Sequence, residues 1–213
     1  MRKVLIGLGV LAGGAVMVVA GVLGMASMEP DRIHLERQLV VQGTPADAYA
    51  HVADLKAMNE WSPWVGKDPT MKQTYSDTTS GVGAWYEWDG NDEVGRGRMT
   101  VLEAVPEKKV VHELAFLHPF EAKAASVVTI EPQGDQVRVV WAFEQDQDLP
   151  SKVFTMFMDM ETLLGPDYEA GMANLEPLIE QTVAERLAAE RAEAEPPNGE
   201  PDAAEAVAPD EPG

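Results

Sequence analysis

Few residues of this chain are spaced for chemistry, and His112 is the foremost of them. It alternates with Val110, Leu114 and Phe116 and so shares the apolar face of a predicted strand. A histidine there could act as a general base or as a polar anchor for a ligand. A core histidine hydrogen-bonded to a neighbour fits the same pattern, and the sequence shows no catalytic partner for it. The sequence therefore predicts no catalytic set, and His112 is the single candidate.

The carboxylates and the other histidines form no catalytic or metal-binding pattern. Glu87, Glu113, Asp159 and Glu161 could each point inward with a raised pKa, but solvated charge explains them better in so acidic a chain. The remaining histidines lack ligand spacing, and the chain has neither a His-Glu-x-x-His motif nor a cysteine. We therefore expect no metal and no cofactor.

The N-terminal segment predicts a membrane anchor. Arg2 and Lys3 precede Val4 to Met28, an uncharged run of 25 residues. As a helix it would be roughly 37 Å long, enough to cross a hydrocarbon core of about 30 Å. We favour an uncleaved anchor over a signal peptide cleaved after Ala26. The basic start places the N-terminus in the cytoplasm, so we expect a single-pass protein of a bacterial inner membrane with its domain on the periplasmic side.

Charge and composition divide the rest of the chain. Residues 193–213 contain mainly Pro, Ala, Glu and Asp with no aromatic residue, which predicts a disordered acidic tail. Residues 30–192 are long enough for one domain with a real core. The net charge of −20 disfavours nucleic acid as a partner. The sequence does not indicate the oligomeric state.

The hydrophobic periodicity of the domain changes twice. It predicts a strand over 33–41, a helix over 45–52, a short helical turn over 55–58 and an aromatic loop over 59–64. Alternating strands are then predicted at about 85–88, 98–105, 110–116, 126–130 and 137–143. A long helix should begin at Pro166 and bend at Pro177. An antiparallel sheet with one wet face and a long C-terminal helix is the expected result.

Two motifs carry a resemblance to a known superfamily. They are Asn-Glu-Trp-Ser-Pro-Trp at 59–64 and Gly-Pro-Asp-Tyr-Glu-Ala-Gly-Met-Ala-Asn-Leu at 165–175. With this element order, the chain resembles the START-like (SRPBCC, Bet v 1-like) superfamily, and in particular its membrane-anchored, polyketide cyclase/dehydrase-like bacterial subgroup. The resemblance implies an α+β helix-grip fold, in which a curled antiparallel sheet surrounds a long C-terminal helix and encloses a cavity for a hydrophobic ligand.

Large side chains on the inner faces, together with aromatic residues of the irregular segments, are the predicted ligand-binding residues. They are Trp61, Trp64, Trp85, Met99, Val101, His112, Leu114, Phe116, Val128, Trp141, Phe143, Phe157, Tyr168, Met172 and Leu175. Three interpretations remain open: a non-enzymatic module that binds a lipid or another hydrophobic small molecule, a cyclase-type enzyme that uses His112 with a cavity carboxylate, and an interaction protein without a ligand.

Overall fold

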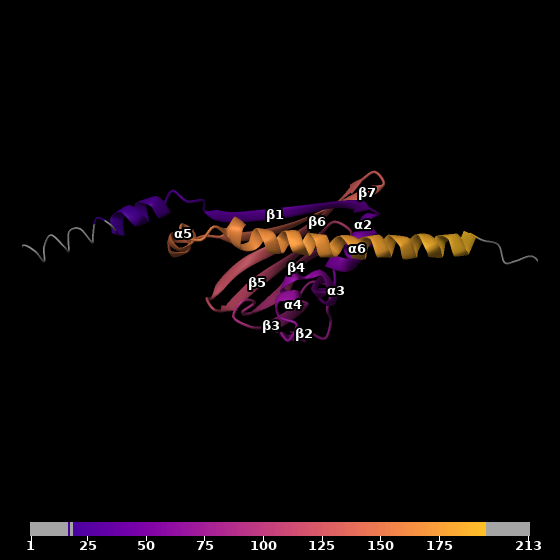
Figure 1. The fold of residues 1–213 in the computed structure, drawn as a ribbon, viewed down its shortest axis with the longest axis horizontal. Coiled ribbons are helices and arrows are strands. Elements are labelled where there is room, and N and C mark those ends of the chain that lie inside the picture. Colours follow the sequence, from indigo (N-terminus) through magenta and orange to yellow (C-terminus); the bar gives the residue numbers. More distant parts are fainter. Residues whose placement is uncertain (1–16, 18, 195–213) are drawn as a thin grey trace, which may run out of the picture.

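A curled, seven-stranded antiparallel sheet packs against one long helix (Figure 1). The computed structural model describes residue 17 and residues 19–194. The strands are β1 (Arg32–Gln42), β2 (Lys72–Tyr75), β3 (Trp85–Asp89), β4 (Arg96–Val105), β5 (Lys109–His118), β6 (Ala122–Gln133) and β7 (Gln136–Asp146). The helices are α2 (Pro45–Val52), α3 (Leu55–Trp61), α4 (Pro63–Lys67), α5 (Leu149–Thr155) and α6 (Met160–Ala194). The predicted α+β helix-grip architecture is confirmed for this part of the chain.

The sheet order is β1-β7-β6-β5-β4-β3-β2, so each strand from β2 to β7 lies beside its neighbour in sequence, and β1 closes onto β7. Side chains alternate between the faces, as the predicted strands require. In β5, for example, Val110, His112 and Leu114 are buried, whereas Val111 and Glu113 are partly exposed. The buried face of the sheet meets α2, α3 and α6, and the hydrophobic core lies between them.

The strand register defines two ends of the sheet. At the first, which we call the proximal end, Arg32 of β1 pairs with Asp146 of β7, and Arg96 of β4 pairs with His118 of β5. At the opposite, distal end, Gln42 pairs with Gln136. Helix α6 begins at the proximal end and runs past the distal end (Figure 1). The two ends therefore differ in which loops and helices they carry.

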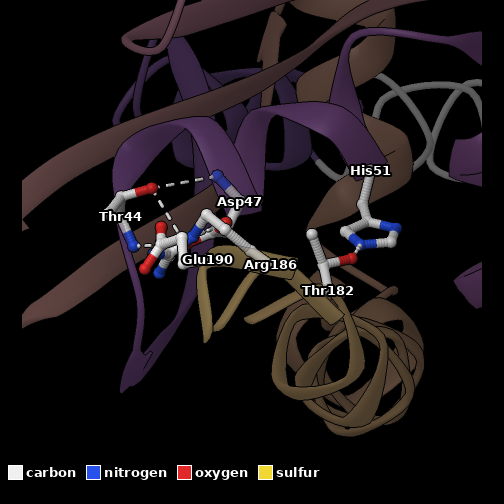
Figure 2. Close-up of polar contacts among 6 residues, drawn as sticks. All are labelled: Thr44, Asp47, His51, Thr182, Arg186 and Glu190. Carbon is white, nitrogen blue, oxygen red and sulfur yellow. Dashed lines mark hydrogen bonds and ion pairs between the residues drawn. The ribbon is translucent and has the colours of Figure 1, made fainter. Parts of the chain in front are cut away.

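The distal half of α6 is joined to α2 by partly buried polar contacts (Figure 2). Thr44 and Asp47 form a capping box at the start of α2. The Asp47 carboxylate also accepts hydrogen bonds from Arg186 Nε at 3.0 Å and Nη2 at 3.1 Å. Burial alone would raise the pKa of Asp47, but the hydrogen bonds from Arg186 and Thr44 lower it below its ordinary value. His51 Nε2 lies 2.8 Å from Thr182 Oγ1, a second link between these helices.

Two sequence predictions about the helices need correction. Helix α6 begins at Met160 rather than at Pro166, because the Asp159 carboxylate accepts hydrogen bonds from the Glu161 amide and the Thr162 hydroxyl. The predicted aromatic loop over 59–64 instead contains the end of α3 and the start of α4, and Pro63 is the first residue of α4.

The predictions for the two ends of the chain fall mostly on residues that the structure does not describe. Residues 19–26 are helical, but most of the predicted span Val4–Met28 lies outside the described residues. Within the described part of the chain, no helix is both long and apolar enough to cross a membrane. The predicted disordered tail lies outside the described residues from 195 onward, and α6 includes residues 193 and 194.

Candidate ligand-binding cavity

A cavity of about 100 Å³ lies between the inner face of the sheet and the first half of α6. Most of its lining is aromatic or aliphatic, contributed by strands β3 to β7, by α4 and its following turn, and by α6. The lining residues are Trp64, Met71, Tyr86, Trp88, Val94, Met99, Leu114, Phe116, Ser126, Trp141, Phe143, Leu164 and Tyr168.

Three aromatic rings form one wall of the cavity. Trp141 of β7 stacks on Tyr168 of α6, with ring centroids 3.9 Å apart. Trp64 meets both edge-on, at 5.8 and 6.2 Å. Helix α6 can approach this closely because residue 171 is glycine, where an added Cβ would lie 2.5 Å from the Trp141 ring. The wall is therefore fixed by packing between the sheet and α6.

The few polar groups in the lining are neutral. The Ser126 hydroxyl accepts a hydrogen bond from Trp141 Nε1 at 2.9 Å. Burial raises the pKa of both Tyr86 and Tyr168, so their hydroxyls stay protonated. No carboxylate of residues 19–194 lines the cavity. The site is thus suited to an apolar group and supplies no charge to it.

His112 lies in the core outside the cavity lining. It pairs with Ser126 across β5 and β6, and its side chain is almost fully buried. Its Nδ1 has no hydrogen-bond partner among the residues that the structure describes. Burial lowers the pKa of His112 to about 4, so the imidazole is neutral at physiological pH. A catalytic role would require it to reach the cavity, from which it is separated in this conformation.

The candidate carboxylates lie away from the cavity. Glu87 pairs with Arg98 on the outer face of the sheet. Glu113 pairs with Lys123, and Glu161 pairs with Arg37. Asp159 caps α6, as described above. Among residues 17 and 19–194, no group of three or more histidine and carboxylate side chains could hold a metal ion.

Seven of the predicted ligand-binding residues line the cavity: Trp64, Met99, Leu114, Phe116, Trp141, Phe143 and Tyr168. Another group lies in the surrounding core, outside the lining: Trp61, Val101, His112, Val128, Met172 and Leu175. Phe157 is 76% exposed. Trp85 lies on the outer face, where Arg98 stacks on its ring at 4.2 Å. Trp85 therefore does not line the cavity, which corrects its prediction as a ligand-binding residue.

Sequence reasoning left six lining residues out of the predicted set: Met71, Tyr86, Trp88, Val94, Ser126 and Leu164. Alternation along β3 could have identified Tyr86 and Trp88 if its inward face had been known. Met71 lies between α4 and β2, and Val94 lies between β3 and β4, so both are in irregular segments without periodicity. Both are partly exposed, as are Trp64, Phe116 and Leu164, so these five residues mark the cavity mouth.

Comparison with known proteins agrees with this geometry. A sequence profile of the family described as "Polyketide cyclase / dehydrase and lipid transport" matches residues 32–180. No curated protein matches the sequence.

Several solved structures share the fold at low sequence identity. The di-domain ARO/CYC StfQ from the steffimycin biosynthetic pathway aligns with a TM-score of 0.54 and 14% identity, over 72% of this chain and 52% of StfQ. Hypothetical protein jhp0584 from Helicobacter pylori aligns with a TM-score of 0.53 and 12% identity, over 70% and 89% of the two chains. The Aha1 dimer from Colwellia psychrerythraea gives 0.50 and 14%, over 70% and 96%. At these identities the likeness concerns the fold alone.

Proposed function

We propose, because the chain belongs to the polyketide cyclase / dehydrase and lipid transport family of the START-like superfamily, that it binds a small hydrophobic molecule in the cavity beneath α6. The observation that carries the proposal is the lining itself. Aromatic and aliphatic side chains from five strands and α6 converge on one space, and the polar groups among them are neutral. Such a site favours apolar ligands, because their apolar surface is removed from water when they enter.

The size of the cavity limits what it can hold in this conformation. At about 100 Å³ it is smaller than typical ligand pockets of roughly 300–1,000 Å³, and smaller than the roughly 150 Å³ core cavity that binds benzene. In this conformation the cavity therefore accommodates part of a ring or a short alkyl segment. A larger ligand requires movement of the mouth, where Met71 and Leu164 are partly exposed and the unbranched Met71 side chain can adapt its shape.

The same lining supports a binding role rather than an enzymatic one. Acid–base catalysis needs a titratable group within hydrogen-bond reach of the substrate. The lining offers Ser126 and two tyrosines whose hydroxyls stay protonated, and His112 lies behind it. We therefore favour a non-enzymatic binding module over a cyclase that uses His112.

We further propose that the domain is tied to a membrane by the apolar run Val4–Met28. The support is the length of this run and its lack of charge. The basic residues Arg2 and Lys3 favour a cytoplasmic N-terminus and a domain on the periplasmic side. A hydrophobic ligand is concentrated in the adjacent bilayer, which suits a protein that must bind a molecule poorly soluble in water.

Uptake of a fluorescent apolar probe by matched variants of Leu164 tests the proposal. Leu164 lines the mouth, so Leu164→Trp should fill the space and weaken binding of the probe by at least about tenfold, or roughly 1.4 kcal/mol. Leu164→Ala should enlarge the space and preserve or strengthen binding. Leu187→Trp, on the exposed distal part of α6, is the control and should bind like the wild type. If the wild type takes up no probe, or if all three variants bind alike, the proposed site is wrong.

A further inference from the structure

Large apolar side chains are exposed together at the proximal end of the sheet. We call this surface the proximal patch, and its residues are Leu117, Phe120, Leu149, Phe154, Phe157 and Leu163. Phe120, Phe154 and Phe157 are 68%, 49% and 76% exposed. The rings of Phe120 and Phe154 contact each other edge to face, with centroids 5.9 Å apart. A group of exposed phenylalanines marks an interaction surface more often than isolated exposed residues do.

The topology brings these residues to one end from four separate segments. They lie at the end of β5, in the turn between β5 and β6, on α5 and the turn after it, and at the start of α6. The strand register places the end of β5 and the end of β7 at the same edge, where β1 begins. Figure 1 shows α5 beside the beginning of β1, with the N-terminal helical residues on the same side.

The chain enters the domain at this patch. Lys152 of α5 donates a hydrogen bond to the Asp31 carboxylate at 2.6 Å, and its side chain is only 9% exposed. The backbone N–H of Gln147 donates a hydrogen bond to the backbone carbonyl of Asp31 at 2.8 Å. Met28, the last residue of the apolar run, is three residues before Asp31. Three residues span at most about 11 Å, so Asp31, which is hydrogen-bonded to Lys152 of α5, must lie within that distance of the end of the run.

The charges around the patch are mainly acidic, although Arg96, which pairs with His118 in the sheet, is an exposed cation at the same end. Glu121 and Asp148 adjoin it and are exposed, as is Asp159 before α6. The two nearest lysines are already paired, Lys123 with Glu113 and Lys152 with Asp31. An acidic rim around exposed phenylalanines favours insertion of the rings below neutral headgroups over electrostatic adsorption.

We infer that the proximal patch lies in the interfacial layer of the bilayer that holds the apolar run, and that it turns the cavity mouth toward the lipid. The inference rests on the anchoring proposed above. The mouth lies at the proximal end as well: Phe116 pairs with Gly97 near the start of β4, and Leu164 is near the start of α6. The headgroup region is about 5–7 Å thick on each side, so a tether of up to about 11 Å allows the patch to reach this layer from the end of the apolar run. An apolar ligand can then pass between bilayer and cavity with little exposure to water.

Depth-dependent quenching of single fluorophores tests this arrangement. The chain has no cysteine, so Phe154→Cys, Phe157→Cys and Val82→Cys each provide one labelling site on an exposed position. Val82 is 70% exposed and lies between β2 and β3 at the distal end, which makes it the matched control. Each full-length variant carries an environment-sensitive dye and is reconstituted into phosphatidylcholine vesicles that contain doxyl-labelled lipid. We expect quenching several-fold stronger at positions 154 and 157 than at position 82.

The outcomes separate this inference from the proposed function. If the chain floats with the vesicles but position 154 is quenched no more than position 82, the inference is overturned, whereas probe uptake by the Leu164 variants still decides ligand binding. If the chain does not float with the vesicles, anchoring and the inference fail together. Replacing part of the lipid with phosphatidylglycerol should weaken quenching at position 154, because the rim is acidic. Stronger quenching there would overturn insertion by apolar contact.

Discussion

Mild acid should destabilise this domain through His112, whose imidazole is almost fully buried. Burial lowers its pKa to about 4 from the ordinary value of 6.5. Between these two values the unfolded chain binds a proton that the folded chain does not bind. Because the folded pKa is the lower one, the contribution of His112 to stability is greatest above pH 6.5 and falls as the pH decreases toward 4.

The two pKa values set the size of this effect. Their difference of about 2.5 corresponds to about 3 kcal/mol of unfolding free energy in full, of which about 2 kcal/mol is lost by pH 5. For a chain of this length, 1 kcal/mol corresponds to roughly 2–4 °C in Tm, so His112 alone should lower Tm by about 4–8 °C at pH 5.

Urea unfolding of the wild type and of His112→Leu, as full chains in a mild non-ionic detergent, measures the effect. Leucine has a similar volume and cannot titrate, so the difference in unfolding free energy should change by about 2 kcal/mol between neutral pH and about pH 5. Other titrating groups, such as His51, contribute to both proteins and cancel. A difference that stays constant across this range would refute the conclusion that His112 is buried in its neutral form.

Two contacts of α6 give further predictions. Gly171→Ala should destabilise the domain by about 1–3 kcal/mol, because its Cβ would meet the Trp141 ring, whereas Gly66→Ala, with open space around it, should be neutral or stabilising by up to about 1 kcal/mol. Equal unfolding midpoints for the two variants would contradict this packing. Arg186→Ala should lower the urea unfolding midpoint, since the buried Asp47 carboxylate loses two hydrogen bonds. This decrease should persist in high salt, and an unchanged midpoint would count against the contact.

Much of the fold follows from local patterns. Strict alternation along β5 predicted its buried face, because one side of an antiparallel sheet contacts the core and the other contacts solvent. The helix predicted over 45–52 is confirmed as α2, and the structure shows Thr44 as its N-cap. The start of α6 was wrong because the usual preference for proline at the first helical position pointed to Pro166. The cap is instead the carboxylate of Asp159.

The cavity was harder to predict because its shape depends on tertiary packing. The run Trp85-Tyr86-Glu87-Trp88 has aromatic residues on both faces, so alternation could not indicate which face is inner. The pairing of Trp88 with Gly97 resolves this, since the Trp88 ring lies where a Cβ on residue 97 would be. Trp141 and Tyr168 stack within the space between the sheet and α6, and a cavity of about 100 Å³ is left beside them. The volume of such a cavity cannot be predicted from a sequence pattern.

Native mass spectrometry of the full chain, extracted from its own membrane in mild detergent, tests the central claim most directly. We expect the wild type to retain an apolar small molecule as a defined mass increment, and Leu164→Trp to lose that increment while remaining folded. Wild-type protein that appears only at the mass of the bare chain, and that takes up no apolar probe afterwards, would contradict a ligand-binding cavity beneath α6.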